Sequence, residues 1–256
     1  MRSLVQVQDG PFGVGGLAQL VERLLCKQEA SGSIPLFSIM YYFPDIDFIY
    51  SSLMGGFFTK DEINPNLNLL NINYEKCRDE YESARHRLVF NEGKEAYQDC
   101  KIATLFGRYH PSMDLAELER VYDQGVYVDP EREIFYTQNT VYVPTLFNLC
   151  LEVGIRQRCS INLLEPGKVI DWHTDLDPQG DDDIIIRGLW GLSVNPQNQE
   201  TCQLLVDSKE GVQNQILSNN SMHFFWGRTK HHVFNNLTTP RACLSFGNVV
   251  PQERIL

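Results

Sequence analysis

Positive charge and long apolar runs are both scarce in this 256-residue sequence. Lys and Arg number 22 against 33 Asp and Glu, which gives a formal net charge of -11. Such a surface repels phosphate backbones and anionic lipid headgroups, so we expect no nucleic-acid partner and no membrane partner. No stretch approaches the roughly 20 apolar residues that a transmembrane helix needs, and we find no secretion signal at the N-terminus.

The cysteines lack the spacing of a disulfide framework or a zinc ribbon. Seven are present, which is an odd number, and no two of them are separated by two residues. This pattern is typical of buried thiols in a reducing compartment. Together with the missing export signal, it predicts a cytoplasmic protein.

Residues 1–39 differ in character from the rest of the chain, with several glycines close together. The segment resembles the peptide obtained when a transfer-RNA gene is translated by mistake. On that interpretation it is a non-native or disordered extension, and the protein starts at Met40. The alternative is a short amphipathic helix, because the apolar residues between Leu17 and Leu25 follow helical spacing. We assign no function to the segment under either interpretation.

Residues 40–154 are predicted to form a mixed, mainly helical part that packs on a core. One segment carries Glu, Arg and Lys at helical spacing, a second follows Ser112 as helix N-cap, and a third ends at Gly154. The predicted helices are Tyr74–Leu88, Met113–Tyr122 and Thr145–Val153.

Residues 155–256 show another pattern, in which short runs rich in Val, Ile, Leu and Phe alternate with turn residues. Short strands at such spacing are typical of a β-sandwich or a jelly roll, so we predict a mainly β or α+β fold. The predicted strands are Arg156–Leu164, Val169–Thr174, Ile184–Val194, Gln203–Val206, Met222–Trp226, His232–Asn235 and Ala242–Val249.

A His-x-Asp pair lies at the end of the second of these strands, with His173 inside it and Asp175 directly after its last predicted residue. Residues i and i+2 of a strand point to the same face, so His173 and Asp175 can converge on one metal ion. The pair is a weak indication by itself, because it often arises by chance. His231, from another strand, would complete two histidines and one carboxylate. That set suits iron(II) and leaves three coordination positions open, two for a 2-oxoacid and one for O2.

Arg241 follows His231 by ten residues, a gap that accommodates a turn between strands. Its planar, permanently charged guanidinium matches a carboxylate, and burying it requires an anionic partner. A dianionic co-substrate is expected there, and the alternative is a core carboxylate. His232 and His223 compete with His231 as third ligand. However, His232 would point to the opposite face of the strand, and His223 is predicted to be a packed or surface residue.

Two segments carry a resemblance to the iron(II)- and 2-oxoglutarate-dependent oxygenase superfamily. Leu164–Asp175 reads Leu-Glu-Pro-Gly-Lys-Val-Ile-Asp-Trp-His-Thr-Asp, and Phe225–Arg241 contains the later His and Arg. Both segments resemble the aspartyl/asparaginyl β-hydroxylase group. The resemblance covers roughly residues 155–250. It implies a double-stranded β-helix core, which is a cupin-like jelly roll, with 155–256 as the catalytic core.

The same resemblance implies roles for individual residues. Asn162 stands at the place of a polar contact to 2-oxoglutarate, and Arg187 lies on the strand that supplies a second arginine. The alternative for Asn162 is a strand residue with local hydrogen bonds, and an inserted loop leaves the alignment of Arg187 open. Animal members have Gly where this chain has Asp175, so the complete triad is closer to prolyl hydroxylase-like members. Cys243 stands where many members have Ser.

These observations predict a dioxygenase that uses iron(II), 2-oxoglutarate and O2. The resemblance implies hydroxylation of an unactivated C–H in an amino-acid unit, with release of succinate and CO2. The expected partner is a small-molecule or peptide substrate, and the sequence does not give the oligomeric state. Two alternatives remain open: a cupin-type metal enzyme without an oxoacid, and a non-catalytic β-sandwich binding module.

Overall fold

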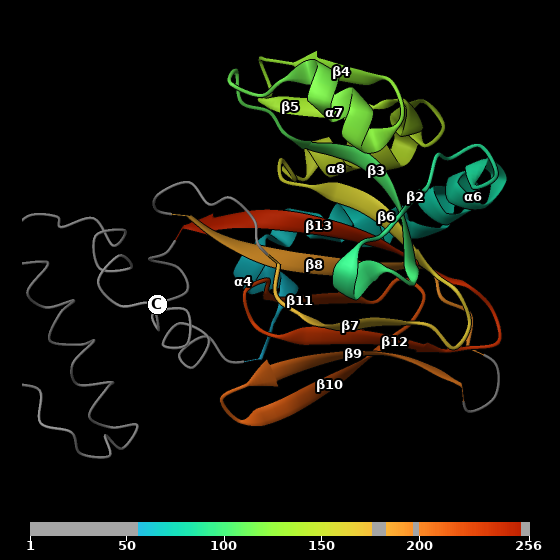
Figure 1. Cartoon of the computed structure of the whole chain (residues 1–256). Coiled ribbons are helices and arrows are strands. Elements are labelled where there is room, and N and C mark those ends of the chain that lie inside the picture. Colours follow the sequence, from blue (N-terminus) through green and yellow to red (C-terminus); the bar gives the residue numbers. More distant parts are fainter. Residues whose placement is uncertain (1–55, 176–182, 197–199, 252–256) are drawn as a thin grey trace, which may run out of the picture. The chain divides into compact units, whose positions relative to one another are not determined.

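The structure is a computed structural model, and it describes residues 56–175, 183–196 and 200–251. These residues belong to one compact unit, Asp47–Leu256, and they are drawn in colour in Figure 1. The predicted extension 1–39 and the predicted start at Met40 lie outside the described residues.

The described residues contain thirteen strands. In chain order they are β1 (Phe57–Phe58), β2 (Asn91–Glu92), β3 (Cys100–Arg108), β4 (Val126–Asp129), β5 (Ile134–Thr137), β6 (Cys159–Leu164), β7 (Val169–His173), β8 (Asp183–Ser193), β9 (Thr201–Ser208), β10 (Gly211–Leu217), β11 (Met222–Trp226), β12 (His231–Asn236) and β13 (Arg241–Pro251). The α-helices are α4 (Lys60–Ile63), α5 (Asn68–Ile72), α6 (Tyr74–Ala84), α7 (Leu115–Tyr122) and α8 (Pro144–Glu152). Short 3-10 helices are η1 (Pro65–Leu67), η2 (Glu95–Tyr97) and η3 (Gln138–Val141).

Two antiparallel sheets form the body of the described unit (Figure 1). The large sheet has the order β1-β11-β8-β13-β6-β3-β5-β4, with β2 paired to β3, and the small sheet has the order β10-β9-β12-β7. The chain moves from β6 in the large sheet to β7 in the small one and back to β8, and it crosses again between β12 and β13. The eight strands β6–β13 therefore contribute four strands to each sheet, which is the predicted jelly roll.

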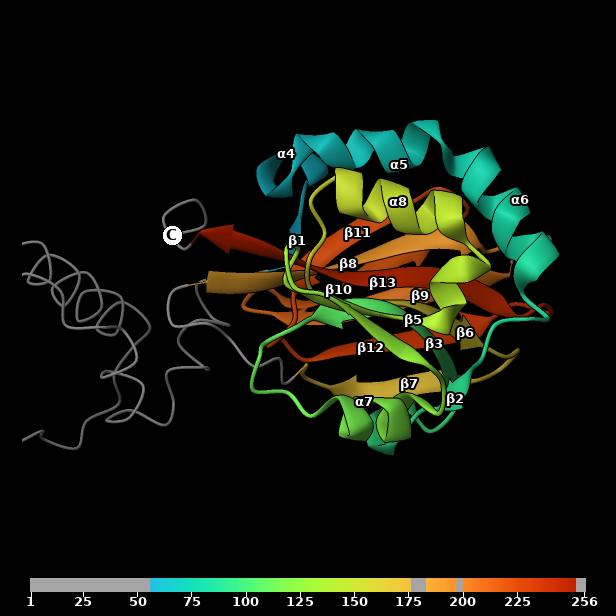
Figure 2. The same cartoon turned by 90° about the horizontal axis from the view of Figure 1, so that it is seen from above.

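The outer face of the large sheet is covered by helices (Figure 2). Apolar side chains of α4, α5, α6 and α8 form one buried cluster with side chains of β3, β6, β8, β11 and β13. This follows from strand alternation, because Leu244 and Phe246 of β13 face the helices while Cys243 and Ser245 face the small sheet. No helix in the described ranges is long and apolar enough to span a membrane.

The N-terminal part differs from the prediction in one respect. It contains helices, but it also supplies β1–β5 to the large sheet, and β3 pairs along its length with β6. The large sheet therefore contains strands from both sides of residue 154. The sequence did not reveal β3, because Ala103–Gly107 is buried throughout and lacks the alternation of a half-exposed strand.

The helix and strand boundaries follow local chemistry. The helix α7 begins after Asp114, whose side chain accepts a hydrogen bond from the Ala116 N–H, so Asp114 and not Ser112 is the N-cap. The predicted stop at Gly154 is confirmed, with a φ of 86° that favours glycine. The strand β10 was not predicted, because its Gln-Asn-Gln centre has low strand propensity.

The side chain of Asn235 hydrogen-bonds to two turns of the chain, the turn between β6 and β7 and the turn between β12 and β13. Its side-chain N–H groups donate to the carbonyls of Leu164, Glu165 and Thr239 at 2.8, 3.1 and 3.3 Å. Its Oδ1 accepts from the Leu237 N–H at 3.2 Å, and the residue is fully buried. The β6–β7 turn and the β12–β13 turn are therefore fixed to each other by one amide.

We predict that Asn235→Ala lowers the free energy of unfolding by about 3 kcal/mol, because one buried and two half-buried carbonyls lose a donor. The neighbouring exposed Asn236 provides the matched control, and Asn236→Ala should change stability by less than about 0.5 kcal/mol. Urea denaturation of both variants measures the difference. Equal stabilities would show that the two turns do not depend on this amide.

Candidate functional site

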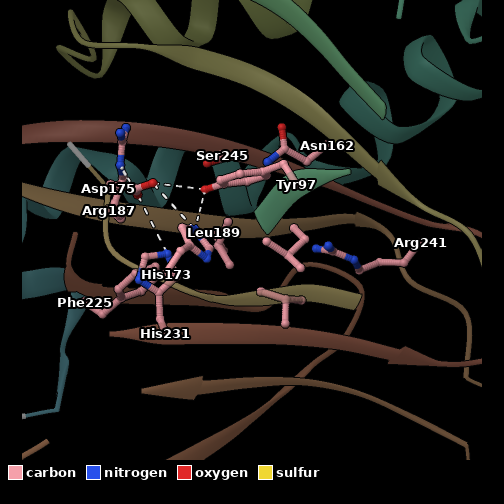
Figure 3. A pocket seen from close by; sticks show the side chains of 12 residues that line it. Tyr97, Asn162, His173, Asp175, Arg187, Leu189, Phe225, His231, Arg241 and Ser245 are labelled. Carbon is pink, nitrogen blue, oxygen red and sulfur yellow. Dashed lines mark hydrogen bonds and ion pairs between the residues drawn. The ribbon is translucent and has the colours of Figure 1, made fainter. Parts of the chain in front are cut away.

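Three side chains from the small sheet and its edge converge on one point. His173 ends β7, His231 begins β12, and the two residues are direct cross-strand partners. Asp175 lies 3.7 Å from His173 (Oδ1 to Nε2) and 3.8 Å from His231 (Oδ2 to Nε2). One ligand atom from each of the three residues lies within 4.8 Å of the others, a grouping that can hold a metal ion (Figure 3).

Both histidines present the same nitrogen to this point. The Nδ1 of His173 lies 2.6 Å from the Asp171 carbonyl, and the Nδ1 of His231 lies 2.8 Å from the Thr229 carbonyl. A carbonyl can only accept, so each Nδ1 carries a hydrogen, and in a neutral imidazole this leaves the lone pair on Nε2. Metal-ligating histidines are typically oriented in this way.

Asp175 reaches the cluster from outside any strand. The prediction placed it in one strand with His173, and this is wrong, because β7 ends at His173. The Asp175 N–H instead donates to the Gly227 carbonyl at 2.8 Å, after the end of β11. A Cβ on Gly227 would lie 3.3 Å from the Asp175 Cβ and 3.1 Å from the Arg187 Cγ, so a glycine allows this close approach.

The protonation states suit cation binding. Burial lowers the pKa of His231 to about 4, so its imidazole is neutral at pH 7. Burial acts to raise the pKa of Asp175, but the Arg187 guanidinium and the two imidazoles outweigh it, and the pKa of Asp175 falls below its usual value. A carboxylate and two neutral imidazoles are the form in which these side chains bind a metal.

A pocket between the two sheets connects this cluster to Arg241. The small sheet contributes Ile170 and Val233 to its walls, and the large sheet contributes Leu189 and Phe225. Figure 3 shows the His/Asp cluster at one end of the pocket, with the Arg241 guanidinium pointing toward it from the other end. The predicted placement of Arg241 in the same interior as the cluster agrees with this structure.

Arg241 is buried without a counter-charge. Its side chain is 1% exposed, and no guanidinium nitrogen has a hydrogen-bond partner in the described part of the chain. The ionisable groups around it are thiols. Burial raises the pKa of Cys100 to about 11 and that of Cys202 to about 12, so these thiols are uncharged at pH 7. A core carboxylate, the alternative partner, is not found there among the described residues.

The other predicted contacts also line the pocket. Asn162 accepts a 2.9 Å hydrogen bond from the Ser160 hydroxyl through Oδ1. Arg187 lines the pocket too, but its Nε donates to Asp175 Oδ2 at 2.7 Å, so it contacts a predicted metal ligand directly. Their roles toward 2-oxoglutarate remain predictions. Ser245, four residues after Arg241, is a pocket residue that the sequence analysis missed, although strand alternation from Arg241 indicates it.

Tyr97 is the other residue that the sequence analysis missed. Its hydroxyl donates to Asp175 Oδ1 at 3.0 Å and lies 2.7 Å from His173 Nε2. The phenol ring packs edge-on against the His173 imidazole, with 4.5 Å between centroids. No spacing rule connects this tyrosine with residues more than 70 positions away, so no pattern in the sequence indicates it.

The two competing histidines point elsewhere. His232 faces the outer side of the small sheet and stacks on Trp172, with 5.4 Å between ring centroids. The Nε2 of His223 lies 3.0 Å from the Ser221 hydroxyl, and the residue is absent from the pocket wall. The structure therefore brings His231, and neither His232 nor His223, to the cluster with His173 and Asp175.

Comparisons with known proteins give distant likenesses only. The chain matches no protein-family model and no curated protein. Among solved structures, it is similar to a Pseudomonas putida prolyl-4-hydroxylase (15% identity, TM-score 0.41, covering 77% of this chain and 94% of that one). It is similar to a 2OG-Fe(II) oxygenase family oxidoreductase from Burkholderia pseudomallei (14% identity, TM-score 0.41, 67% and 77%). A Trichoplax adhaerens prolyl hydroxylase in complex with a peptide fragment gives 16% identity and a TM-score of 0.36 over 73% and 88%. At these values the likenesses assign no family.

We predict that His231→Ala weakens metal binding by at least roughly 100-fold, because it removes a ligand and not only a supporting partner. His232→Ala is the matched control, since the adjacent side chain faces the other side of the sheet, and it should bind as the wild type does. Titration of the metal-free proteins with Co(II), followed by visible absorption, measures both constants. Equal loss in the two variants would contradict the assignment.

Proposed function

We propose that this protein is an iron(II)- and 2-oxoglutarate-dependent dioxygenase. The observation that carries the proposal is a buried guanidinium without a counter-charge in the same pocket as two tautomer-fixed histidines and a carboxylate. Two histidines and one carboxylate are the donors of the facial triad that suits iron(II). A dianionic oxoacid supplies the negative charge that Arg241 lacks.

The residues present fit these groups well. His173, Asp175 and His231 would hold iron(II), and Arg241 would bind the far carboxylate of 2-oxoglutarate with its planar fork. When bound, iron(II) and the oxoacid activate O2 for hydroxylation of a C–H bond, with release of succinate and CO2. The apolar walls between the two ends exclude water, which strengthens the charge interactions inside.

The two alternative functions explain less of the site. A cupin-type metal enzyme without an oxoacid gives no reason for burying Arg241 without a partner, at a cost in stability. A non-catalytic binding module gives no reason for two imidazoles whose lone pairs meet a carboxylate in the interior. The proposed substrate is an amino-acid unit, free or in a peptide, and the resemblance of the ligand segments to amino-acid hydroxylases supports it.

We predict opposite effects of Arg241→Met on binding and on stability. Loss of the guanidinium expected to meet the far carboxylate should weaken 2-oxoglutarate binding at least roughly 30-fold and abolish succinate release, since truncation of a buried charge pair costs about 2–5 kcal/mol. The ligand-free variant should unfold at a higher temperature than the wild type, because a buried unpaired charge is replaced by an apolar chain of similar length.

Calorimetric titration with 2-oxoglutarate, succinate assays and thermal unfolding test this prediction together. Arg108→Met serves as control, because Arg108 is exposed at the end of β3, and it should leave binding and turnover unchanged. A ligand-free Arg241→Met protein that is clearly less stable than the wild type would indicate a structural role for Arg241 and count against the oxoacid.

A further inference from the structure

Each carboxylate oxygen of Asp175 accepts a hydrogen bond from a side chain. The Arg187 Nε donates to Oδ2 at 2.7 Å, and the Tyr97 hydroxyl donates to Oδ1 at 3.0 Å. Arg187 lies on β8 of the large sheet and is only 4% exposed, and Tyr97 ends the short helix η2. A ligand at the edge of the small sheet is thus oriented by two side chains from elsewhere in the fold.

Such support matters because Asp175 has no strand to fix it. The residue follows the end of β7, and one backbone hydrogen bond, to the Gly227 carbonyl, holds its main chain. That bond does not restrict rotation of the side chain. The two donors from Arg187 and Tyr97 restrict it, so they determine which face of the carboxylate meets the histidines.

The turn before Tyr97 has features that place it over the cluster. A Cβ on Gly93 would lie 2.0 Å from the Tyr97 carbonyl oxygen, so only glycine permits this backbone approach. Glu95 has a φ of 52°, in the left-handed region that non-glycine residues rarely adopt. Backbone strain of this kind persists where the surrounding structure requires it, and here it brings a hydroxyl to Asp175.

The Tyr97 hydroxyl has a single hydrogen, and this decides which of its two contacts, to Asp175 or to His173, can persist when a metal is bound. The hydroxyl has one hydrogen and faces two acceptors, His173 Nε2 and Asp175 Oδ1, because the His173 Nδ1 already carries the imidazole hydrogen. A metal ion on the Nε2 lone pair leaves Asp175 as the acceptor for that hydrogen. The contact to Asp175 is therefore the one compatible with a loaded centre.

We propose that Arg187 and Tyr97 are positioning residues that clamp Asp175 and thereby set the metal affinity of the centre. The inference rests on the proposed metal site but adds two residues to it, and it gives Arg187 a role other than the predicted contact with the oxoacid. Outer partners of metal ligands typically contribute 10- to 100-fold in affinity. Both residues act through Asp175 and are not themselves ligands.

The test is Co(II) binding by the full chain, with Tyr97→Phe and Arg187→Gln compared with the wild type. Tyr97→Phe keeps the ring against His173 and removes only the hydroxyl, so we expect roughly 10-fold weaker binding. Arg187→Gln removes the charge, and the loss should approach roughly 100-fold. The visible spectrum of bound Co(II) should change shape in both variants. Tyr127→Phe, at an exposed position on β4, should change neither quantity.

The outcomes separate the clamp from the proposed function. A wild-type protein that binds no Co(II) or iron(II) would overturn the metal site itself. Wild-type binding with unchanged affinity and spectrum in folded Tyr97→Phe would overturn the clamp and leave the metal site intact. Tighter binding in Tyr97→Phe would also overturn it, because the hydroxyl would then compete with the metal for His173.

Discussion

A guanidinium that is buried between two sheets and meets no counter-ion among the described residues is the constraint on which the rest of this site depends. Arg241 begins β13 of the large sheet and faces the small sheet, where the walls offer apolar side chains and uncharged thiols. A charge in that position lowers the stability of the ligand-free fold. Natural proteins retain such groups where function requires them, and the anion that satisfies Arg241 must enter the pocket that also holds the His/Asp cluster.

The order of the strands in the two sheets explains why the His/Asp cluster and Arg241 line the same pocket. Antiparallel pairing of β7 with β12 places His173 opposite His231, so two residues distant in sequence share one face of the small sheet. The crossing from β12 to β13 then moves the chain into the opposing sheet within a few residues, which is why the spacing from His231 to Arg241 is short. The fold thus sets the proposed metal ligand His231 and the proposed anion-binding residue Arg241 on facing walls, and Asn235 fixes the turns through which the chain crosses.

Sequence reasoning recovered the residues whose positions follow from strand alternation. His173, His231 and Arg241 lie at the ends of strands, and strand alternation together with the resemblance of the ligand segments indicated that they meet. Asp175 was placed correctly at the cluster for a reason that does not hold, since its strand has already ended. Tyr97 could not be predicted, because a strained turn and a close backbone contact deliver it, and neither leaves a periodic pattern. The strands β3 and β10 were not predicted, because β3 is buried on both faces and β10 has a polar centre, so neither shows the expected alternation.

Charge balance links the two ends of the pocket. Arg187 and Asp175 offset each other at the cluster, whereas Arg241 has no such partner in the described residues. A divalent ion at the cluster adds to the positive charge already present, so the pocket then attracts a dianion more strongly than before. By the reciprocity of linked binding, a bound dianion must hold the metal more tightly in turn.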